Sequence, residues 1–287
     1  MNYDGTATDS FAGTLGTATL NHFSVTKSGT GALELKGNNA YSGGTTVSAG
    51  ALFVNNSAGS ATGSGALSVG AGATLGGTGT SSGSSFNISG SSSARANVLV
   101  GQSFAGDTTT AGQLTLVGSN ASTLAAANLS FNLKADGTSN ELQVQNTAVS
   151  FGTVGALNTT LTLNVQGAAP AINTAYVLIA GTAVGTDALS SQFASGLSFG
   201  ASSGSLSTGL TTLILDSNQG GSGNLTLAGL DSTLAQNSYL FLYQNSTTGV
   251  DAIEVEVDVV PEPGTWAMLL GGLGLLLFWQ RRKRQKL

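Results

Sequence analysis

Residues 25–47 read VTKSGTGALELKGNNAYSGGTTV, and the related stretches AGALFVN and GATLGGTG follow at residues 49–55 and 72–79. Leu33 and Leu35 alternate here with polar neighbours, and glycine closes each run. Alternation at period two is typical of a strand with one buried face. The stretch therefore predicts short strands joined by tight glycine corners.

Similar alternating runs recur along most of the chain, at residues 67–70, 114–118, 129–133, 142–144, 161–165, 175–179 and 225–229. Many short strands separated by turn residues indicate a sandwich, a barrel or a β-solenoid. The glycines that close four of the runs are expected to supply the positive φ of a corner: Gly37, Gly70, Gly118 and Gly229. Four asparagines are expected in left-handed or turn conformations, with ladders of stacked side chains as the alternative: Asn38, Asn39, Asn55 and Asn56. Tyr41 is expected to pack across a turn.

Composition favours a folded, exported body without a reaction centre. The 287 residues include 42 Gly, no Cys and one His, with 40% hydrophobic and 8% charged residues. A disordered chain would be poorer in apolar residues and richer in charge. The missing cysteines exclude a disulfide framework, a thiolate metal site and cysteine-based catalysis.

Charge is divided unevenly between the body and the end of the chain. Five of the 9 Lys and Arg residues fall in the last seven positions, which leaves four to face 14 acidic residues and a body charge near −10. Such a body repels phosphate groups, so we expect no nucleic-acid partner. Residues 1–6 have neither the basic region nor the apolar region of a secretory signal, so we expect the natural start to lie upstream.

The last 27 residues form a tripartite tail. The motif Pro261, Glu262, Pro263 precedes an uncharged apolar run, and a basic cluster ends the chain. The apolar run predicts a membrane helix that includes Trp266, Leu270, Gly274, Phe278 and Trp279. The basic cluster, Arg281, Arg282, Lys283, Arg284 and Lys286, is expected on the cytoplasmic side. From Gly264 to Gln280 the helix would be about 25 Å long, short of the roughly 30 Å of hydrocarbon.

These three parts, in this order, resemble the PEP-CTERM sorting signal of Gram-negative bacteria over residues 259–287. The resemblance implies that an exosortase, a membrane protease, reads the tail and cuts near the motif. It also implies a chain that is exported, inserted in the membrane by its C-terminal helix, and then placed on the cell surface or in the extracellular matrix. The alternative is a permanent tail anchor.

Residues 25–79 are similar to the autotransporter-associated β-strand repeat, through the Lys-x-Gly-x-Gly start, the Asn-x-x-Tyr-x-Gly-Gly-Thr-Thr core and the closing Gly-Gly-Thr-Gly. The resemblance implies an all-β, right-handed parallel β-helix. We expect residues 1–24 to be the truncated start of this solenoid and residues 80–258 to be its β-rich continuation with Gly/Ser-rich loops. We expect residues 259–287 to be the sorting signal.

Candidate reaction centres are weak. The single His22 is expected to be a surface or turn residue, and one His without Cys makes no zinc site. One face of a predicted strand carries three carboxylates, Glu254, Glu256 and Asp258. They could help to bind Ca²⁺, but the simpler interpretation is a solvated face that protects a sheet edge. Gly43–Gly44 and Gly76–Gly79 lack the lysine and helix of a phosphate loop and are expected to be β-corners.

The sequence thus predicts a structural or adhesive surface protein, not an enzyme, with no cofactor. Its Ser- and Thr-rich faces suit weak, repeated hydrogen bonds to extracellular polysaccharide. The competing hypothesis is a glycan-active, lyase-like β-helix enzyme. That hypothesis requires Lys27, Lys36, Arg95 or Lys134 to meet Asp residues in a cleft.

Overall fold

The computed structural model describes residues 1–17, 19, 22–102, 111–146, 149–150, 159–166 and 174–181. Beyond these it gives the strands Leu210–Leu215, Leu225–Leu230, Ser238–Thr247 and Val250–Val259, with side chains only at Glu254 and Val255. Every regular element in this part of the chain is a β-strand. No helix in it is long and apolar enough to cross a membrane. The predicted membrane helix lies outside the described residues.

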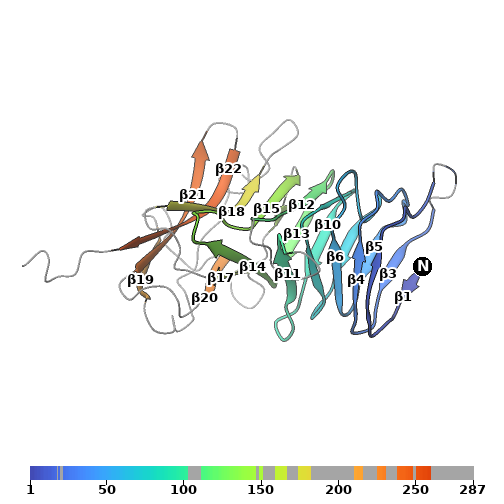
Figure 1. Cartoon of the computed structure of the whole chain (residues 1–287), viewed down its shortest axis with the longest axis horizontal. Helices are drawn as coiled ribbons and strands as arrows, with labels where there is room; N and C mark the ends of the chain where they lie inside the picture. Colours follow the sequence, from blue (N-terminus) through green and yellow to red (C-terminus); the bar gives the residue numbers. More distant parts are fainter. Residues whose placement is uncertain are drawn as a thin grey trace, which may run out of the picture.

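The strands stack side by side along the long axis of the molecule, from β1 at one end to β19 at the other (Figure 1). Their bounds are β1 Asn2–Tyr3, β2 Thr8–Phe11, β3 Val25–Lys27, β4 Ala32–Leu35, β5 Thr45–Val47, β6 Ala51–Val54, β7 Leu67–Val69, β8 Thr74–Gly77, β9 Thr80–Gly83, β10 Phe86–Ser89, β11 Ala96–Val100, β12 Gln113–Gly118, β13 Ser122–Ala125, β14 Ala127–Lys134, β15 Glu141–Asn146, β16 Val149–Ser150, β17 Thr159–Gln166, β18 Thr174–Gly181, β19 Leu210–Leu215, β20 Leu225–Leu230, β21 Ser238–Thr247 and β22 Val250–Val259.

The strands form three sheets, which the chain visits in turn. Sheet A has the order β1-β3-β5-β7-β10-β13-β16, sheet B the order β2-β4-β6-β8-β11-β14-β17-β20, and sheet C the order β19-β21-β22-β18-β15-β12-β9. Pairing is parallel throughout sheets A and B. This is the architecture of a parallel β-solenoid, and it confirms the prediction of an all-β chain with parallel sheets.

Sheet C departs from this pattern at its C-terminal side. β22 is antiparallel to both of its neighbours, β18 and β21. The last described strand therefore lies inside the sheet and runs against the direction of the coils, which the parallel prediction did not include.

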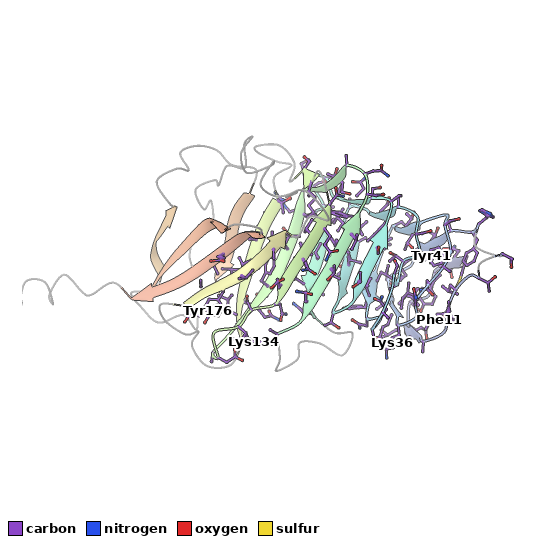
Figure 2. All side chains as sticks on the ribbon, turned by 90° about the horizontal axis from the view of Figure 1, so that it is seen from above. Phe11, Lys36, Tyr41, Lys134 and Tyr176 are labelled. Atoms are coloured by element: carbon purple, nitrogen blue, oxygen red, sulfur yellow. The ribbon has the colours of Figure 1, made fainter. Side chains whose placement is uncertain are left out.

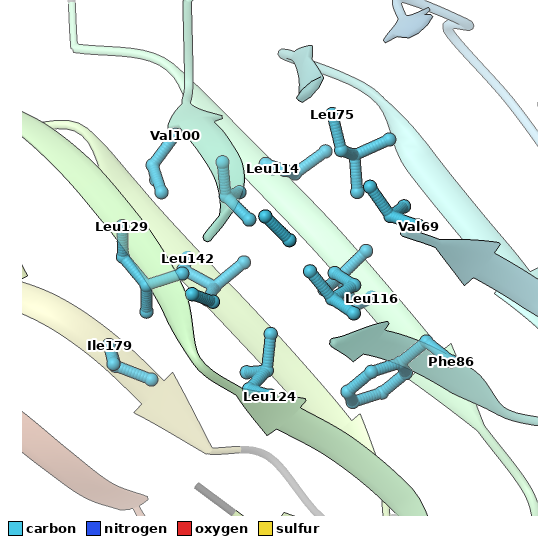
Figure 3. Packing of buried hydrophobic residues seen from close by; sticks show 14 of the residues in the cluster. Val69, Leu75, Phe86, Val100, Leu114, Leu116, Leu124, Leu129, Leu142 and Ile179 are labelled. Atoms are coloured by element: carbon cyan, nitrogen blue, oxygen red, sulfur yellow. The ribbon is translucent and has the colours of Figure 1, made fainter. Parts of the chain in front are cut away.

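The core is built from aligned columns of apolar side chains. In sheet B one column passes through successive coils in register, and each of its side chains is at most 4% exposed: Leu33, Leu52, Leu75, Val98, Leu129 and Leu161. Figure 3 shows how Leu75, Val100 and Leu129 of sheet B meet Leu114, Leu116 and Leu142 of sheet C in the interior. Each coil alone buries too little, so stacking supplies the continuous core.

Lys27 occupies a core position in sheet A. It pairs in register with Val47, which pairs with Val69, so an ammonium stands in a column of aliphatic side chains. Its Nζ atom donates to the carbonyl oxygens of Ser28, Gly29 (2.8 Å) and Ala49 (3.2 Å) at the corner. Burial lowers the pKa of this ammonium. The side chain thus ties two neighbouring coils together at a corner.

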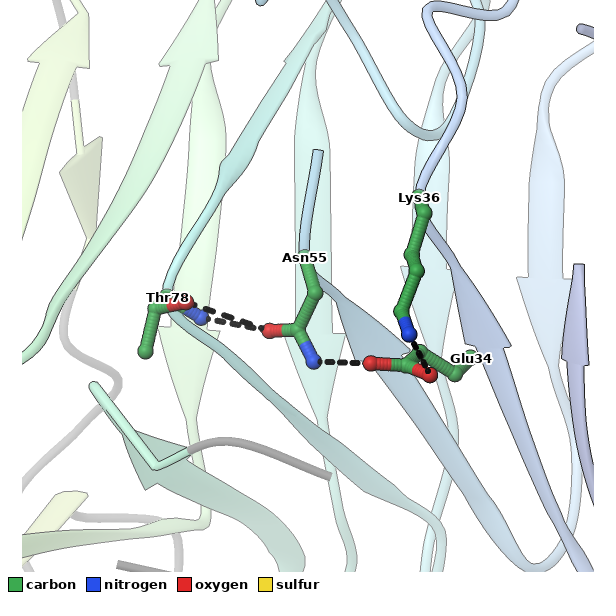
Figure 4. A network of polar contacts seen from close by, with 4 residues as sticks. All are labelled: Glu34, Lys36, Asn55 and Thr78. Atoms are coloured by element: carbon green, nitrogen blue, oxygen red, sulfur yellow. Dashed lines mark hydrogen bonds and ion pairs between the residues drawn. The ribbon is translucent and has the colours of Figure 1, made fainter. Parts of the chain in front are cut away.

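The asparagines of the repeat connect neighbouring coils. None of the four has positive φ, so the left-handed expectation is wrong. Asn55 Oδ1 accepts from Thr78 N at 2.9 Å, and its Nδ2 donates to Glu34 Oε1 at 2.7 Å (Figure 4). Asn56 makes the equivalent link, because its Oδ1 accepts from Thr80 N at 2.8 Å. These amides fasten each coil to the next where the backbone leaves the strand.

Glu34 shows the electrostatic consequence of this network. Burial opposes ionisation of its carboxyl, but the hydrogen bonds from Asn55, Ser10 and Lys36 outweigh it and lower the pKa. Lys36 Nζ lies 3.1 Å from Glu34 Oε2 in the same network. The carboxylate is therefore held ionised on the outer face of sheet B.

The glycines with positive φ differ from those predicted. Gly37, Gly70 and Gly118 do not have it, and Gly229 lies within β20. The corners between sheets A and B instead use Gly29, Gly50 and Gly72, with φ of 66°, 66° and 74°. Gly44 is a corner glycine as expected, with φ of 85°, whereas Gly76 and Gly77 belong to β8.

Tyr41 is fully buried near the N-terminal end of the solenoid, whereas Tyr176 lies toward the other end (Figure 2). The Tyr41 hydroxyl is 2.6 Å from Thr45 Oγ1, and its ring stacks on Phe23 with centroids 5.2 Å apart. Burial raises the pKa of Tyr41 to about 12.

We expect Tyr41 to titrate late and to link stability to pH. Because its folded pKa lies above the unfolded value of about 10, its contribution is fully present below pH 10 and is lost as pH rises toward 12. The contribution is on the order of 2–3 kcal/mol. Tyrosinate absorbance of the wild type should include a component that ionises near pH 12, and Tyr41→Phe should remove that component. A wild-type chain whose tyrosines all ionise near pH 10 while folded would contradict this.

Candidate functional site

The outer face of sheet C carries a polar groove across β9, β12 and β15. The strands pair in register, so outward side chains form two files: Thr80, Thr115 and Gln143 in the first, and Ser82, Val117 and Gln145 in the second. Successive members of a file lie about 4.8 Å apart, and the files are about 6.6 Å apart along the strands. The inward neighbours Leu114, Leu116, Leu142 and Val144 belong to the core, so the solenoid fixes this surface from below.

The groove is a continuous hollow. Its larger part has a volume of about 550 Å³ and extends past Thr80 to the corner at Gly59 and Ser60. A second part of about 350 Å³ shares Ser82, Val117 and Gln145 with it and continues to Asn146. None of the residues that line either part carries a formal charge.

Amide and hydroxyl groups in the groove hold one another in place. Gln143 Oε1 accepts from Gln145 Nε2 at 3.2 Å and from Thr115 Oγ1 at 3.4 Å. At the rim, Gln113 Nε2 donates to Glu141 Oε1 at 2.8 Å. The groove thus presents neutral donors and acceptors that are held by hydrogen bonds to one another.

Sequence patterns predict the strands of this groove but not the groove itself. The runs at residues 114–118 and 142–144 mark strands by their buried leucines and valines. Thr115 and Gln143 lie between these apolar residues and Gln145 follows them, but only the pairing of β12 with β15 shows that they are neighbours on one face.

The sequence-predicted sorting residues lie outside the part that the structure describes. This holds for the motif at residues 261–263, for the membrane segment with Trp266, Leu270, Gly274, Phe278 and Trp279, and for the basic cluster at residues 281–286. The last described residue is Val259 at the end of β22, and one residue, Val260, separates it from Pro261.

His22 is exposed, as expected, and its Nδ1 lies 3.4 Å from Ser42 Oγ. Glu254 differs from expectation. It is 7% exposed, and β22 is bordered by β18 and β21, so the hypothesis of a solvated edge face is wrong for this residue. Among the described residues, no three His, Cys, Asp or Glu side chains gather as a metal site.

Three of the body cations, Lys27, Lys36 and Lys134, have different surroundings in the solenoid. Lys27 contacts backbone carbonyls and Lys36 pairs with Glu34. Lys134 ends β14, four strand positions from β4 in sheet B, or roughly 19 Å at about 4.8 Å per strand. On the adjoining turn, hydrogen bonds from Thr138, with a smaller effect of Lys134, hold the pKa of Asp136 below its usual range. This Lys and Asp pair is local to one turn and lies outside the groove lining.

The fold and its surface define a parallel β-solenoid protein with an uncharged polar groove. Residues 25–53 match the passenger-associated-transport repeat, and residues 259–284 match the PEP-CTERM protein-sorting motif. The chain therefore carries both elements, and both resemblances seen in the sequence are confirmed. The repeat match covers the first part of the stretch 25–79. No curated protein matches the chain.

The two matches point to an exported surface protein of structural type. The sorting motif supports export to the cell envelope or surface, and it implies processing related to an exosortase. The repeat is of the type found in autotransporter passengers, in agreement with the parallel coils that contain it.

Proposed function

We propose that the chain is a structural or adhesive protein of the cell surface or extracellular matrix, without enzymatic activity, that an exosortase-type membrane protease sorts and cleaves near Pro261–Glu262–Pro263. The apolar run beyond the motif inserts as a transmembrane helix, with the basic cluster on the cytoplasmic side. The coils wind in the right-handed sense of passenger repeats.

One observation carries this proposal: the sorting motif follows the folded body without a spacer. β22 ends at Val259, and the motif match begins at residue 259. A solenoid of stacked coils supplies a long, regular surface, and the tail supplies the route by which that surface leaves the cell.

The surface chemistry favours contact over reaction. Acid–base catalysis needs a titratable group positioned at the reacting atom. The groove lining instead consists of neutral hydroxyl, amide and small side chains. Lys27 and Lys36 make separate structural contacts, Lys27 with corner carbonyls and Lys36 with Glu34 at the end of β4.

The intact mass of the protein recovered from the outside of its native cells tests the sorting step. We expect a species that ends near Pro263 and lacks the basic cluster. A Pro261→Ala/Pro263→Ala variant is expected to lose this cleavage, whereas Pro170→Ala, at the one proline outside the motif, should be processed as wild type. Wild-type protein that retains residues 281–287 would instead be a permanently tail-anchored surface protein.

A further inference from the structure

We propose that the groove on sheet C binds one extended chain of a neutral polysaccharide, which lies across β9, β12 and β15. This inference rests on the proposed surface function and names the class of ligand and the site that would take it.

The unused hydrogen-bonding groups of the groove match sugar hydroxyls. Gln143 Oε1 already accepts from Thr115 and Gln145, which leaves Gln143 Nε2 to donate and Gln145 Oε1 to accept. Neither atom has a partner within the described part of the chain. A sugar hydroxyl both donates and accepts, so one hydroxyl can engage both atoms. Both side chains are half-buried and hydrogen-bonded to each other, so little rotamer freedom remains to be lost on binding.

The shape of the groove favours a chain over a compact ligand. The two hollows share Ser82, Val117 and Gln145, so the surface continues past a single sugar ring. A polymer that crosses the strands meets a new side chain about every 4.8 Å. Val117, between Ser82 and Gln145 in the second file, offers an apolar contact for the C–H face of a ring.

The uncharged lining of the groove favours a neutral polysaccharide over an acidic one. Binding a carboxylated or sulfated chain would call for Lys or Arg in the lining, and the lining has neither. Glu141 stands at the rim beside Gln113 and would repel an anionic polymer. The ligand class is therefore neutral.

Affinity gel electrophoresis tests the site. The full-length protein, solubilised in a neutral mild detergent, is run in gels that contain dextran, a β-glucan or alginate, and its retardation is measured. We expect retardation by at least one neutral glucan and none by alginate. Gln143→Ala/Gln145→Ala is expected to weaken the interaction about tenfold, as the loss of two or three hydrogen bonds implies. The melting temperature of this variant should stay within a few degrees of wild type, because both side chains lie on the outer face and the core below them is unchanged.

The matched control is Asn87→Ala/Thr123→Ala, which removes an amide and a hydroxyl from the outer face of sheet A, where the two residues pair in register. This control should bind like wild type. Equal weakening by both double variants, equal binding by wild type and the groove variant, or wild-type binding to alginate alone would each overturn the proposal. Binding to none of the polymers would overturn it as well. Cleavage at the sorting motif is read separately by mass, so failure of the groove and failure of the surface function are distinguishable.

Discussion

Leu75→Ala is expected to lower the free energy of unfolding by about 2–5 kcal/mol, the usual cost of a large cavity in a packed core. Leu75 is fully buried and pairs in register with Leu52 in the preceding coil and Val98 in the next. The cavity therefore opens in the middle of a continuous column. Denaturant unfolding followed by circular dichroism measures the loss.

The effect should also be local along the chain. Coils of a solenoid contact mainly their neighbours, so stability is a sum of coil and interface contributions. Hydrogen exchange is expected to speed up most in β6, β8 and β11, and least in β15 and β17. Thr46→Ala, on the exposed face of β5, is the control and should change stability by less than about 0.5 kcal/mol. Equal effects of the two substitutions would contradict the assignment of this core.

Gly77→Ala is expected to destabilise the chain by about 3 kcal/mol or more. Gly77 has φ of 126°, a conformation that costs a residue with a Cβ about 1–3 kcal/mol. A Cβ at this position would also lie 2.0 Å from the carbonyl oxygen of Val54 in the preceding coil. Backbone cannot yield as a flexible side chain does, so β6 and β8 must separate. Thermal unfolding measures the loss.

Gly70→Ala is the matched control. Gly70 also closes a short strand, but its φ is not positive, and the nearest atom to an added Cβ is Val47 O at 3.7 Å. That is ordinary van der Waals contact, so we expect a change within about 0.5 kcal/mol. If Gly70→Ala were as damaging as Gly77→Ala, the close approach of coils at Gly77 would not be the cause.

These two glycines show what sequence patterns predict and what they leave open. Alternation at Leu33 and Leu35 correctly predicts a strand and its buried face, because burial has the period of the strand itself. The φ of a glycine depends on where the neighbouring coil lies, which no local pattern records. Gly70 and Gly77 are therefore alike in sequence and different in structure.

Lys27 shows that local sequence patterns also fail to predict the burial of a charged residue. Its place in a column with Val47 and Val69 contradicts the rule that lysines are exposed. The position is tolerated because three corner carbonyls lie within reach of Nζ, and two of them belong to the turn that follows Lys27 itself.

The groove could be located only from the register between neighbouring coils. The pairing of Thr80 with Thr115 spans 35 residues, whereas Val25 and Thr45, in neighbouring coils of sheet A, are 20 residues apart. Because insertions change the coil length, the sequence cannot align Thr80, Thr115 and Gln143 in one file. A polar outer surface was predicted, but its location was not.

The antiparallel placement of β22 has a mechanical consequence. Hydrogen bonds of antiparallel pairs lie across the strands, and β22 is paired with both β18 and β21. A pull on the chain at Val259 along β22 loads these bonds together in shear. Parallel coils pulled from their free end would instead peel away one at a time. We therefore expect the solenoid to resist a pull from its tail more strongly than a pull on its first coil.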